Sequence, residues 1–469
     1  MLVTRNGSAV SYELVRYELM ERLGDARRRS DEVFSVLRDD AFYERPIPER
    51  HRIIFYVGHL EAFDWNLLHE NVLALKSFHP EFDRLFAFGI DPVGSGLPSD
   101  QPSDWPSFDA VRDYVSGIRT ALDEKLESAC GERHSDSRDG VPVDTLLNVA
   151  VEHRLMHVET LAYMLHQLAL DKKVRAERPE NLGTRRLGTR SLDTRPLAQR
   201  PVVQRMVAIP AGVATLGLLR SSETFGWDNE HEAHAADVPA FAIDQYKVTN
   251  RLYLDFMAAG GYETRGFWRD EDWDWKTGQG ISHPVFWKKA GKGWLYRTMF
   301  GEVPLPLDWP VYVSHAEASA YTRWAGKSLP TEAEWHRAAY STSGESEEIF
   351  SGRSEAPSVR CSKTGPGNFD FRRWDPTPVN EFPEGRSAFG VDDMLGNGWE
   401  WTSTVFAPFP GFKPFPFYRG YSADFFDGKH FVMKGGSAHT AACMLRPSFR
   451  NWFQAHYQYV YAGFRCVER

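Results

Sequence analysis

Cysteine is scarce in this chain, with only four among 469 residues. They stand at Cys130, Cys361, Cys443 and Cys466, and none of them makes the short spacings of a zinc site or a redox pair. Disulfide frameworks belong to oxidising compartments. We therefore expect a protein of the reducing cytoplasm rather than a secreted, disulfide-stabilised one.

Long apolar runs and excess positive charge are also missing. No stretch of about 18 apolar residues occurs, and no charged-then-apolar leader is seen, so we expect no membrane span and no export. The formal net charge of -9 argues against a nucleic-acid partner. What the chain does have is 42% hydrophobic residues, enough for sizeable cores, and a length typical of two or three domains.

The pattern changes in kind along the chain. Residues 1–170 read as about four long amphipathic helices, interrupted at 89–107, where Pro and Gly forbid a helix. Residues 171–205 are rich in arginine and predict a solvated interdomain linker rather than an anion-binding segment. From 206 to 469 the chain has short strand-like pieces, frequent turns and most of its surplus of aromatic residues, with one helix expected at 315–325. This order predicts an α+β protein.

Two histidines in the segment 144–168 are the most informative residues. His153 and His157 are four apart on the apolar stripe of an expected helix, so both should face a core. Burying an unpaired polar group costs roughly 2 to 7 kcal/mol, which leaves two interpretations: metal ligands, or core histidines bonded to carbonyl groups. Glu159 lies about 200° around the helix from His157 and is a poor third ligand.

His59 is the best candidate for a third ligand. It lies in 52–76, another amphipathic helical pattern, in which Phe55, Phe63 and Leu67 share its face. Helix bundles build metal sites from side chains on facing helices, and three neutral imidazoles would leave about three open positions on an octahedral ion. Open positions favour catalysis over a purely structural metal.

Seven motifs carry a resemblance to a known pairing of domains. They are VAIPAG (207–212), DQYKVTNRLYLDFM (244–257), VYVSHAEASAYTRWAGKSLPTEAEWHRAA (311–339), GNGWEWT (396–402), KGGSA (434–438), RPSFRNW (446–452) and AGFRC (462–466). The second half thus resembles the formylglycine-generating-enzyme/sulfatase-modifying domain, a C-type-lectin-like fold, and the first half resembles a DinB-like four-helix bundle. Together they resemble the ergothioneine-type sulfoxide synthases and the related selenoneine synthase.

That resemblance implies an enzyme that uses non-haem Fe(II) and O2 to attach sulfur or selenium to C2 of the imidazole of hercynine, a trimethylated histidine. It assigns His59, His153 and His157 as iron ligands and Glu159 to a supporting position. A formylglycine-generating enzyme would need cysteines at positions 440 and 445, where this chain has Thr440 and Leu445. We therefore do not expect that activity.

The same resemblance implies the remaining site residues. A Tyr-x-x-Tyr element after a Pro-Gly-Phe turn supplies a proton or hydrogen atom, and Tyr418 and Tyr421 have that spacing, although the stretch is one residue longer than usual. The alternative is an aromatic loop packed on the sheet. Asn451 and Trp452 match a pair near the substrate, whose trimethylammonium should be held by aromatic faces and carboxylates. GNGWEWT, with Asn397 and Glu400, can be structural or can hold a calcium ion.

The expected sulfur or selenium donor follows from charged residues that this chain lacks. Relatives that use gamma-glutamylcysteine carry an arginine-rich segment after the first histidine and an aspartate after the Asn-Trp pair. Here the corresponding loop, FAFGIDPVGSGLPSDQPSDWPS, has no arginine, and Phe453 replaces the aspartate. Charge-assisted contacts are worth about 1.5 to 3 kcal/mol each, so we expect a neutral 1-selenosugar donor, with cysteine or another thiol as the alternative. A DinB-like zinc or nickel thiol transferase and a non-catalytic binding module also remain open.

Overall fold

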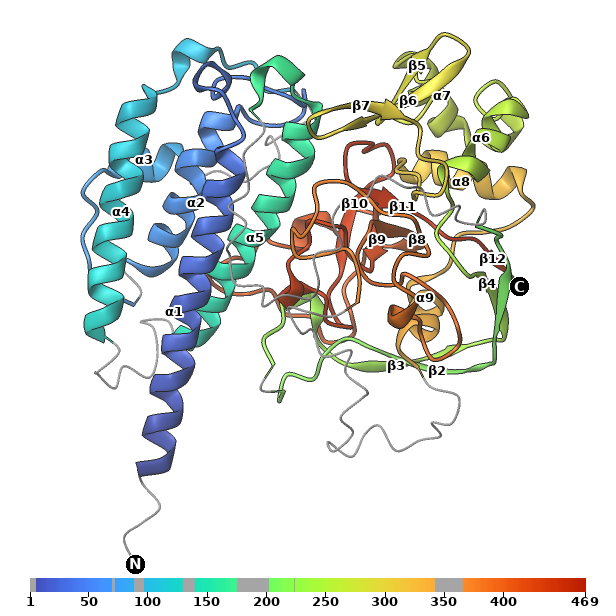
Figure 1. Ribbon diagram of the computed structural model, residues 1–469. Helices are drawn as coiled ribbons and strands as arrows, with labels where there is room; N and C mark the ends of the chain where they lie inside the picture. Colours follow the sequence, from blue (N-terminus) through green and yellow to red (C-terminus); the bar gives the residue numbers. More distant parts are fainter. Residues whose placement is uncertain are drawn as a thin grey trace, which may run out of the picture.

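The computed structural model describes residues 6–69, 72–87, 97–129, 140–174, 202–222, 224–341 and 366–469. A helical half and a half of short strands and helices lie side by side (Figure 1). This confirms the expected α+β class. Most of the expected linker at 171–205 and part of the interruption at 89–107 lie outside the described residues, so the domain boundaries at 170 and 205 stay predictions.

The described residues of the helical half form four long helices and a short one. The long ones are α1 (Asn6–Phe34), α2 (Ile53–Leu68), α4 (Phe108–Ala129) and α5 (Val143–Gln167), and the short one is α3 (Pro80–Leu85). Helix α5 confirms the prediction for 144–168. Helix α2 ends at Leu68, short of the expected Lys76. The next residue, His69, donates both its backbone N–H and its Nδ1–H to the Trp65 carbonyl, the latter at 2.7 Å.

A buried ion pair sets the register of α2 against α5. Arg154 of α5 donates to Glu61 Oε2 at 2.8 Å and to Asp64 Oδ2 at 2.6 Å, both on α2. All three side chains are almost fully buried, so the guanidinium has to stay in this geometry to compensate both carboxylates. The neighbouring His153 is thereby brought opposite His59.

The second half is built around a four-stranded sheet with the order β10-β9-β8-β11. Its strands are β8 (Trp399–Val405), β9 (His430–Lys434), β10 (Asn451–Gln454) and β11 (Ala462–Gly463). Strands β9 and β10 are antiparallel with Trp452 opposite Val432. The described residues also form three smaller sheets. The first consists of β1 (Met206–Ile209), β4 (Phe241–Asp244) and β12 (Val467–Glu468), and the second of β2 (Gly212–Leu216) and β3 (His234–Val238). The third consists of β5 (Trp287–Ala290), β6 (Gly293–Thr298) and β7 (Gly301–Pro304).

The part of this half that the structure describes also contains the helices α6 (Asn250–Ala258), α7 (Asp270–Gly278), α8 (His315–Trp324) and α9 (Glu332–Tyr340). Helix α8 confirms the helix expected at 315–325. It begins at a capping box in which Ser314 accepts from the Glu317 backbone N–H and Glu317 accepts from that of Ser314. Such a reciprocal cap satisfies two orphan donors, so α8 has a fixed start.

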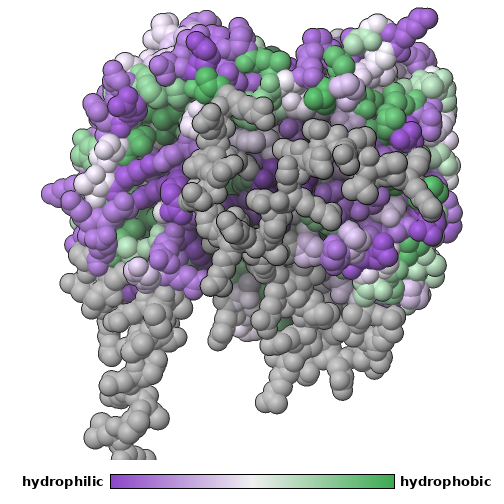
Figure 2. All heavy atoms as spheres, viewed as in Figure 1, coloured by the Kyte–Doolittle hydropathy of each residue, from purple (hydrophilic) through white to green (hydrophobic). Residues whose placement is uncertain are grey.

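Helix α5 lies on the side of the bundle that faces the second half (Figure 1). A single hydrophobic core runs from the bundle into the strand-rich half, and it includes Leu161 of α5 and Trp399 of β8. On the face drawn in Figure 2, hydrophilic residues cover much of the described surface and apolar residues form separate patches. Among the described helices, none is both long and apolar enough to cross a membrane.

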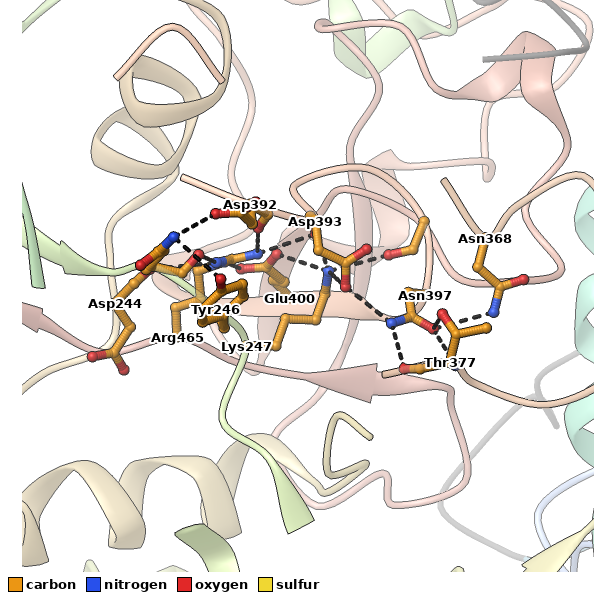
Figure 3. Close-up of polar contacts among 12 residues, drawn as sticks. Asp244, Tyr246, Lys247, Asn368, Thr377, Asp392, Asp393, Asn397, Glu400 and Arg465 are labelled. Atoms are coloured by element: carbon orange, nitrogen blue, oxygen red, sulfur yellow. Dashed lines mark hydrogen bonds and ion pairs between the residues drawn. The ribbon is translucent and has the colours of Figure 1, made fainter. Parts of the chain in front are cut away.

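The GNGWEWT motif lies in a buried polar network (Figure 3). Lys247 donates to the carbonyl oxygens of Asp393 and Gly396 and pairs with Glu400 at 3.3 Å. Asn397 bonds to Thr377 and Asp393. The side-chain oxygens of the motif already have partners: Asn397 Oδ1 accepts from Asn368 Nδ2 and from the Thr377 backbone N–H, and the Glu400 carboxylate pairs with Lys247 and Arg465. This geometry favours the structural interpretation of the motif.

Replacing Lys247 by Met should destabilise the second half strongly. The substitution leaves the buried Asp393 carboxylate without its cation, an effect worth about 3 to 5 kcal/mol. Lys288→Met is the control, because Lys288 and Glu302 form an exposed pair worth about 0 to 1 kcal/mol. Denaturant unfolding measures both free energies, and equal losses in the two variants would contradict this account of the network.

Candidate metal centre and its surroundings

Three buried histidines converge between α2 and α5. The Nε2 atom of His157 lies 3.2 Å from that of His59 and 3.1 Å from that of His153. All three candidate ligand atoms lie within 4.8 Å of one another, and they form the one such cluster found among the described residues. The structure therefore brings together the three histidines that the helical patterns singled out.

Their ring orientation is set by one hydrogen bond and by aromatic packing. His59 Nδ1 donates to the Phe86 carbonyl at 2.7 Å, which leaves its Nε2 as an acceptor facing the other two rings. His153 stacks on Phe63 with a centroid distance of 3.4 Å, and His59 stacks on Phe55 at 4.8 Å. No hydrogen-bond partner for the Nδ1 atoms of His153 and His157 is found among the described residues, so packing and the contacts between Nε2 atoms orient those rings.

Burial keeps the three rings neutral. It lowers the pKa of His59 to about 4 and holds the pKa values of His153 and His157 well below the usual value. The neighbouring histidines lower the last two further, because two imidazolium ions in contact repel one another. Neutral imidazole is the form that binds metal ions.

Tyr418 and Tyr421 have different neighbours next to this centre. The Tyr418 ring is 6.3 Å from that of His153 and 5.4 Å from that of Phe63, and burial, reinforced by the charge of Asp228, raises its pKa to about 12. Tyr421 stacks on Trp227 at 3.9 Å, and its hydroxyl lies 3.5 Å from the Met156 sulfur. Tyr418 is thus the tyrosine in ring contact with a candidate ligand.

The three β10 residues expected to bind substrate contact different neighbours. Trp452 stacks on Phe406 at 4.2 Å and meets Tyr421 edge-on at 5.5 Å. Phe453 stacks on Tyr457 at 4.9 Å. Asn451 is half-buried, and its Oδ1 accepts from the Trp452 backbone N–H at 2.9 Å. Trp452 therefore contacts Tyr421, and Phe453 belongs to a second aromatic group.

Sequence reasoning missed a buried arginine in that second group. Arg50 donates to the hydroxyls of Tyr457 at 2.9 Å and Tyr163 at 3.1 Å. Its guanidinium carbon lies 6.0 Å from the Phe453 ring centre, and its charge also lowers the pKa of His157. A lone arginine just before an expected helix carries no motif, so only the fold reveals its place beside Phe453.

Two carboxylates of α5 bind the second half, and neither contacts the three histidines. Glu159 accepts from Trp399 Nε1 at 2.7 Å, from Ser437 Oγ at 2.5 Å and from Thr440 Oγ1 at 2.8 Å. Glu152 accepts from Trp227 Nε1 at 2.8 Å. The expectation that Glu159 points away from the metal position is confirmed.

Glu152 also belongs to a buried charge cluster. Arg446 donates to Glu152 Oε1 at 2.7 Å and to Glu230 Oε2 at 2.8 Å. The two carboxylates hold the pKa of Arg446 well above its usual value, so the guanidinium stays charged although it is buried. This cluster and Glu159 fix α5, and with it His153 and His157, against the second half.

Comparison with known proteins matches both halves. Residues 193–469 match the family described as sulfatase-modifying factor enzyme 1-like domain, and residues 22–161 match the DinB superfamily. The hercynine oxygenase of Mycolicibacterium smegmatis is 33% identical over 97% of this chain and 99% of its own length. This chain belongs to the hercynine oxygenase family.

Other relatives match over part of the chain. The hercynine oxygenase of Mycobacterium tuberculosis is 39% identical over 54% of this chain and 58% of its own length. A formylglycine-generating enzyme of the same organism is 31% identical over 54% of this chain and 95% of its length. Among solved structures, PvdO from Pseudomonas aeruginosa covers 56% of this chain and 93% of its own at 19% identity, with a TM-score of 0.35.

The histidine centre fits the iron expected in this family. Two nitrogen ligands at about 2.1 Å and at right angles on one ion are separated by about 3.0 Å, and the two closest Nε2 pairs are 3.2 and 3.1 Å apart. Three nitrogen donors on one side of an ion leave positions for substrate and O2, as in other non-haem iron sites. With the family established, this chain is an iron-dependent oxidoreductase.

The two positions at which a formylglycine-generating enzyme would need cysteines, 440 and 445, hold residues with structural contacts. Thr440 donates to Glu159, and Leu445 is a buried apolar residue in a small cluster with Phe369 and Ala442. Cys443 is partly buried, and burial raises its pKa to about 12, which keeps it as an unreactive thiol. Thr440, which stands at one of the two cysteine positions, is thus a contact between the two halves.

His157→Ala should abolish stoichiometric Fe(II) binding, because His157 Nε2 contacts the Nε2 atoms of both other histidines. His79→Ala is the control, since His79 belongs to the same bundle but caps α3 instead. Anaerobic Fe(II) titration with iron analysis measures both. Full iron binding by the His157 variant would refute the ligand assignment.

Proposed function

We propose that this protein is an Fe(II)- and O2-dependent hercynine oxygenase that forms a carbon–sulfur bond between a thiol and C2 of the hercynine imidazole. The observation that carries the proposal is the convergence of three buried, neutral imidazoles on one point. A full-length relative that bears the name hercynine oxygenase supports it. When bound, iron supplies the redox chemistry, while the protein supplies binding, orientation and proton control.

The residues around the centre have distinct proposed roles. The aromatic group of Trp452, Phe406 and Tyr421 suits the trimethylammonium of hercynine, which cannot donate a hydrogen bond. Asn451, at the start of β10, is proposed to orient the substrate carboxylate through its amide N–H. Tyr418 holds a proton at neutral pH, because its raised pKa of about 12 keeps the phenol protonated, and it is the proposed proton or hydrogen donor.

A thiol that carries a carboxylate is the preferred donor. The Arg50 guanidinium lies over the Phe453 and Tyr457 rings, at 6.0 and 5.1 Å from their centres, and its charge supports the proposal that a carboxylated donor binds beside it. The arginine-free loop did not predict this cation. Part of that loop, residues 88–96, lies outside the described residues. Cysteine and gamma-glutamylcysteine both fit this chemistry.

A 1-selenosugar remains the second candidate donor. The stacked pair Phe453 and Tyr457 is an aromatic platform of the kind that suits a neutral sugar, and Phe453 stands where dipeptide-using relatives carry an aspartate. Such a reaction would form a carbon–selenium bond at the same carbon and would lead to selenoneine.

Product analysis separates the donors. The Fe(II)-loaded protein is incubated with hercynine, O2 and, in parallel, cysteine, gamma-glutamylcysteine or a 1-selenosugar, and the products are weighed. We expect O2 uptake that requires hercynine, and a carbon–sulfur product. Arg50→Gln should lower kcat/KM for a carboxylated thiol by about tenfold to hundredfold, the value of a charge-assisted contact, and spare the neutral sugar.

Two outcomes would contradict this assignment. If the iron-loaded protein shows no hercynine-dependent O2 uptake, the oxygenase proposal is wrong, and a thiol transferase or a binding module is favoured. A faster reaction with the selenosugar than with either thiol would reverse the donor preference and leave the iron site intact.

Tyr418→Phe should retain iron and change the rate or the product ratio by about 10²-fold or more, the usual contribution of a positioned proton donor. Tyr421→Phe is the matched variant, and we expect a small effect, because its hydroxyl contacts only the Met156 sulfur among the hydrogen-bond partners described. Single-turnover kinetics with product quantification measures both. A larger effect in the Tyr421 variant would move the role to that residue.

A further inference from the structure

The segment that carries both tyrosines has little structure of its own. Between Phe415 and Ser422 the chain forms turns, with internal backbone bonds from Tyr418 N–H to the Phe415 carbonyl and from Tyr421 N–H to the Tyr418 carbonyl, each at 3.2 Å. A functional side chain on such a loop keeps its position only if other parts of the fold hold the loop. We call residues 415–422 the tyrosine loop.

One buried carboxylate contacts both ends of the tyrosine loop. Asp228 Oδ1 accepts from Ser422 Oγ at 2.6 Å, and Asp228 Oδ2 accepts a longer bond from the Phe415 backbone N–H at 3.4 Å. Asp228 is fully buried, and 187 and 194 residues separate it from these two partners in sequence. Tyr418 and Tyr421 lie between the two anchored points.

The residues next to Asp228 extend this anchor to the metal helix. Trp227 stacks on Tyr421 at 3.9 Å and donates its indole N–H to Glu152, the residue before His153. Glu230 accepts from the Trp227 backbone N–H at 2.8 Å and pairs with Arg446, which also binds Glu152. The segment 227–230 is thus held on α5 on one side and holds the tyrosine loop on the other.

We propose that Asp228 is a positioning residue that fixes the tyrosine loop so that Tyr418 stays against the histidine centre. The inference rests on the proposed function, because it takes Tyr418 as the proton or hydrogen donor. Asp228 itself touches neither the histidines nor the substrate-binding residues of β10 in any described contact. Its effect on the reaction therefore passes through the tyrosine loop, either because Asp228 holds the loop in place or because its charge raises the pKa of Tyr418. The neutral Asp228→Asn variant separates these two routes, because it keeps the acceptor oxygen and removes the charge.

A double-mutant cycle tests this route. Asp228→Ala should keep Fe(II) stoichiometry and the KM for hercynine, and lower kcat by about tenfold to hundredfold, as expected for a misplaced reacting group. In a Tyr418→Phe background the same substitution should cause no further loss, because the group that it positions is already gone. Asp228→Asn should recover much of the activity, since its amide oxygen can still accept from Ser422.

Asp424→Asn is the matched control. Asp424 is an exposed carboxylate two residues beyond Ser422, and it should leave kcat unchanged. An Asp228→Ala loss of the same size with and without the Tyr418 phenol would overturn the proposal, because the residue would then act through general stability. A wild-type kcat in Asp228→Ala would overturn it as well.

A measurement without turnover keeps this inference separate from the proposed function. Hydrogen exchange, followed by mass spectrometry, reports the loop in peptides that cover residues 412–426. We expect faster exchange there in Asp228→Ala than in the wild type or in Asp424→Asn, with the bundle peptides unchanged. If exchange in the tyrosine loop is the same in Asp228→Ala as in the wild type, Asp228 does not hold the loop, even if the enzyme is active. If exchange rises as expected but the wild-type protein has no oxygenase activity, only the proposed function is refuted.

Discussion

The attachment of α5 to both halves is the constraint on which the site depends. On one side Arg154 binds Glu61 and Asp64 of α2, which brings His59 to His153 and His157. On the other side, two carboxylates of α5, Glu152 and Glu159, each accept an indole N–H from the second half. The helix that carries two of the candidate ligands therefore also determines where the aromatic residues of the other half lie.

Buried charge in these contacts favours specificity over stability. Desolvation of two ions often cancels their attraction, but removal of one partner leaves an uncompensated charge and costs several kcal/mol. The cluster of Glu152, Arg446 and Glu230 therefore tolerates one relative placement of the halves and penalises others. Such a constraint suits the proposed active site, in which the bundle would supply the metal ligands and the second half would supply the proton donor and the substrate contacts.

Local patterns were sufficient to predict that His59, His153 and His157 converge. The four-residue spacing of His153 and His157, together with the apolar stripe around them, led to the observed face of α5, and the face shared with Phe55 and Phe63 led to His59. Contacts between the halves could not be predicted in this way. Glu152 meets Arg446 across 294 residues and Glu159 meets Thr440 across 281, and His59 is oriented by a backbone carbonyl that any residue would provide. The donor prediction relied on missing residues and overlooked Arg50, which reaches Phe453 only through the fold.

The central claim is that His59, His153 and His157 hold one ferrous ion where the bundle meets the second half. Anomalous diffraction at the iron edge, from crystals loaded anaerobically with Fe(II), tests it most directly. The account predicts a single strong peak at about 2.1 Å from the Nε2 atoms of all three histidines. A peak at any other ligand set, or three histidines bonded to protein groups with no peak between them, would contradict it.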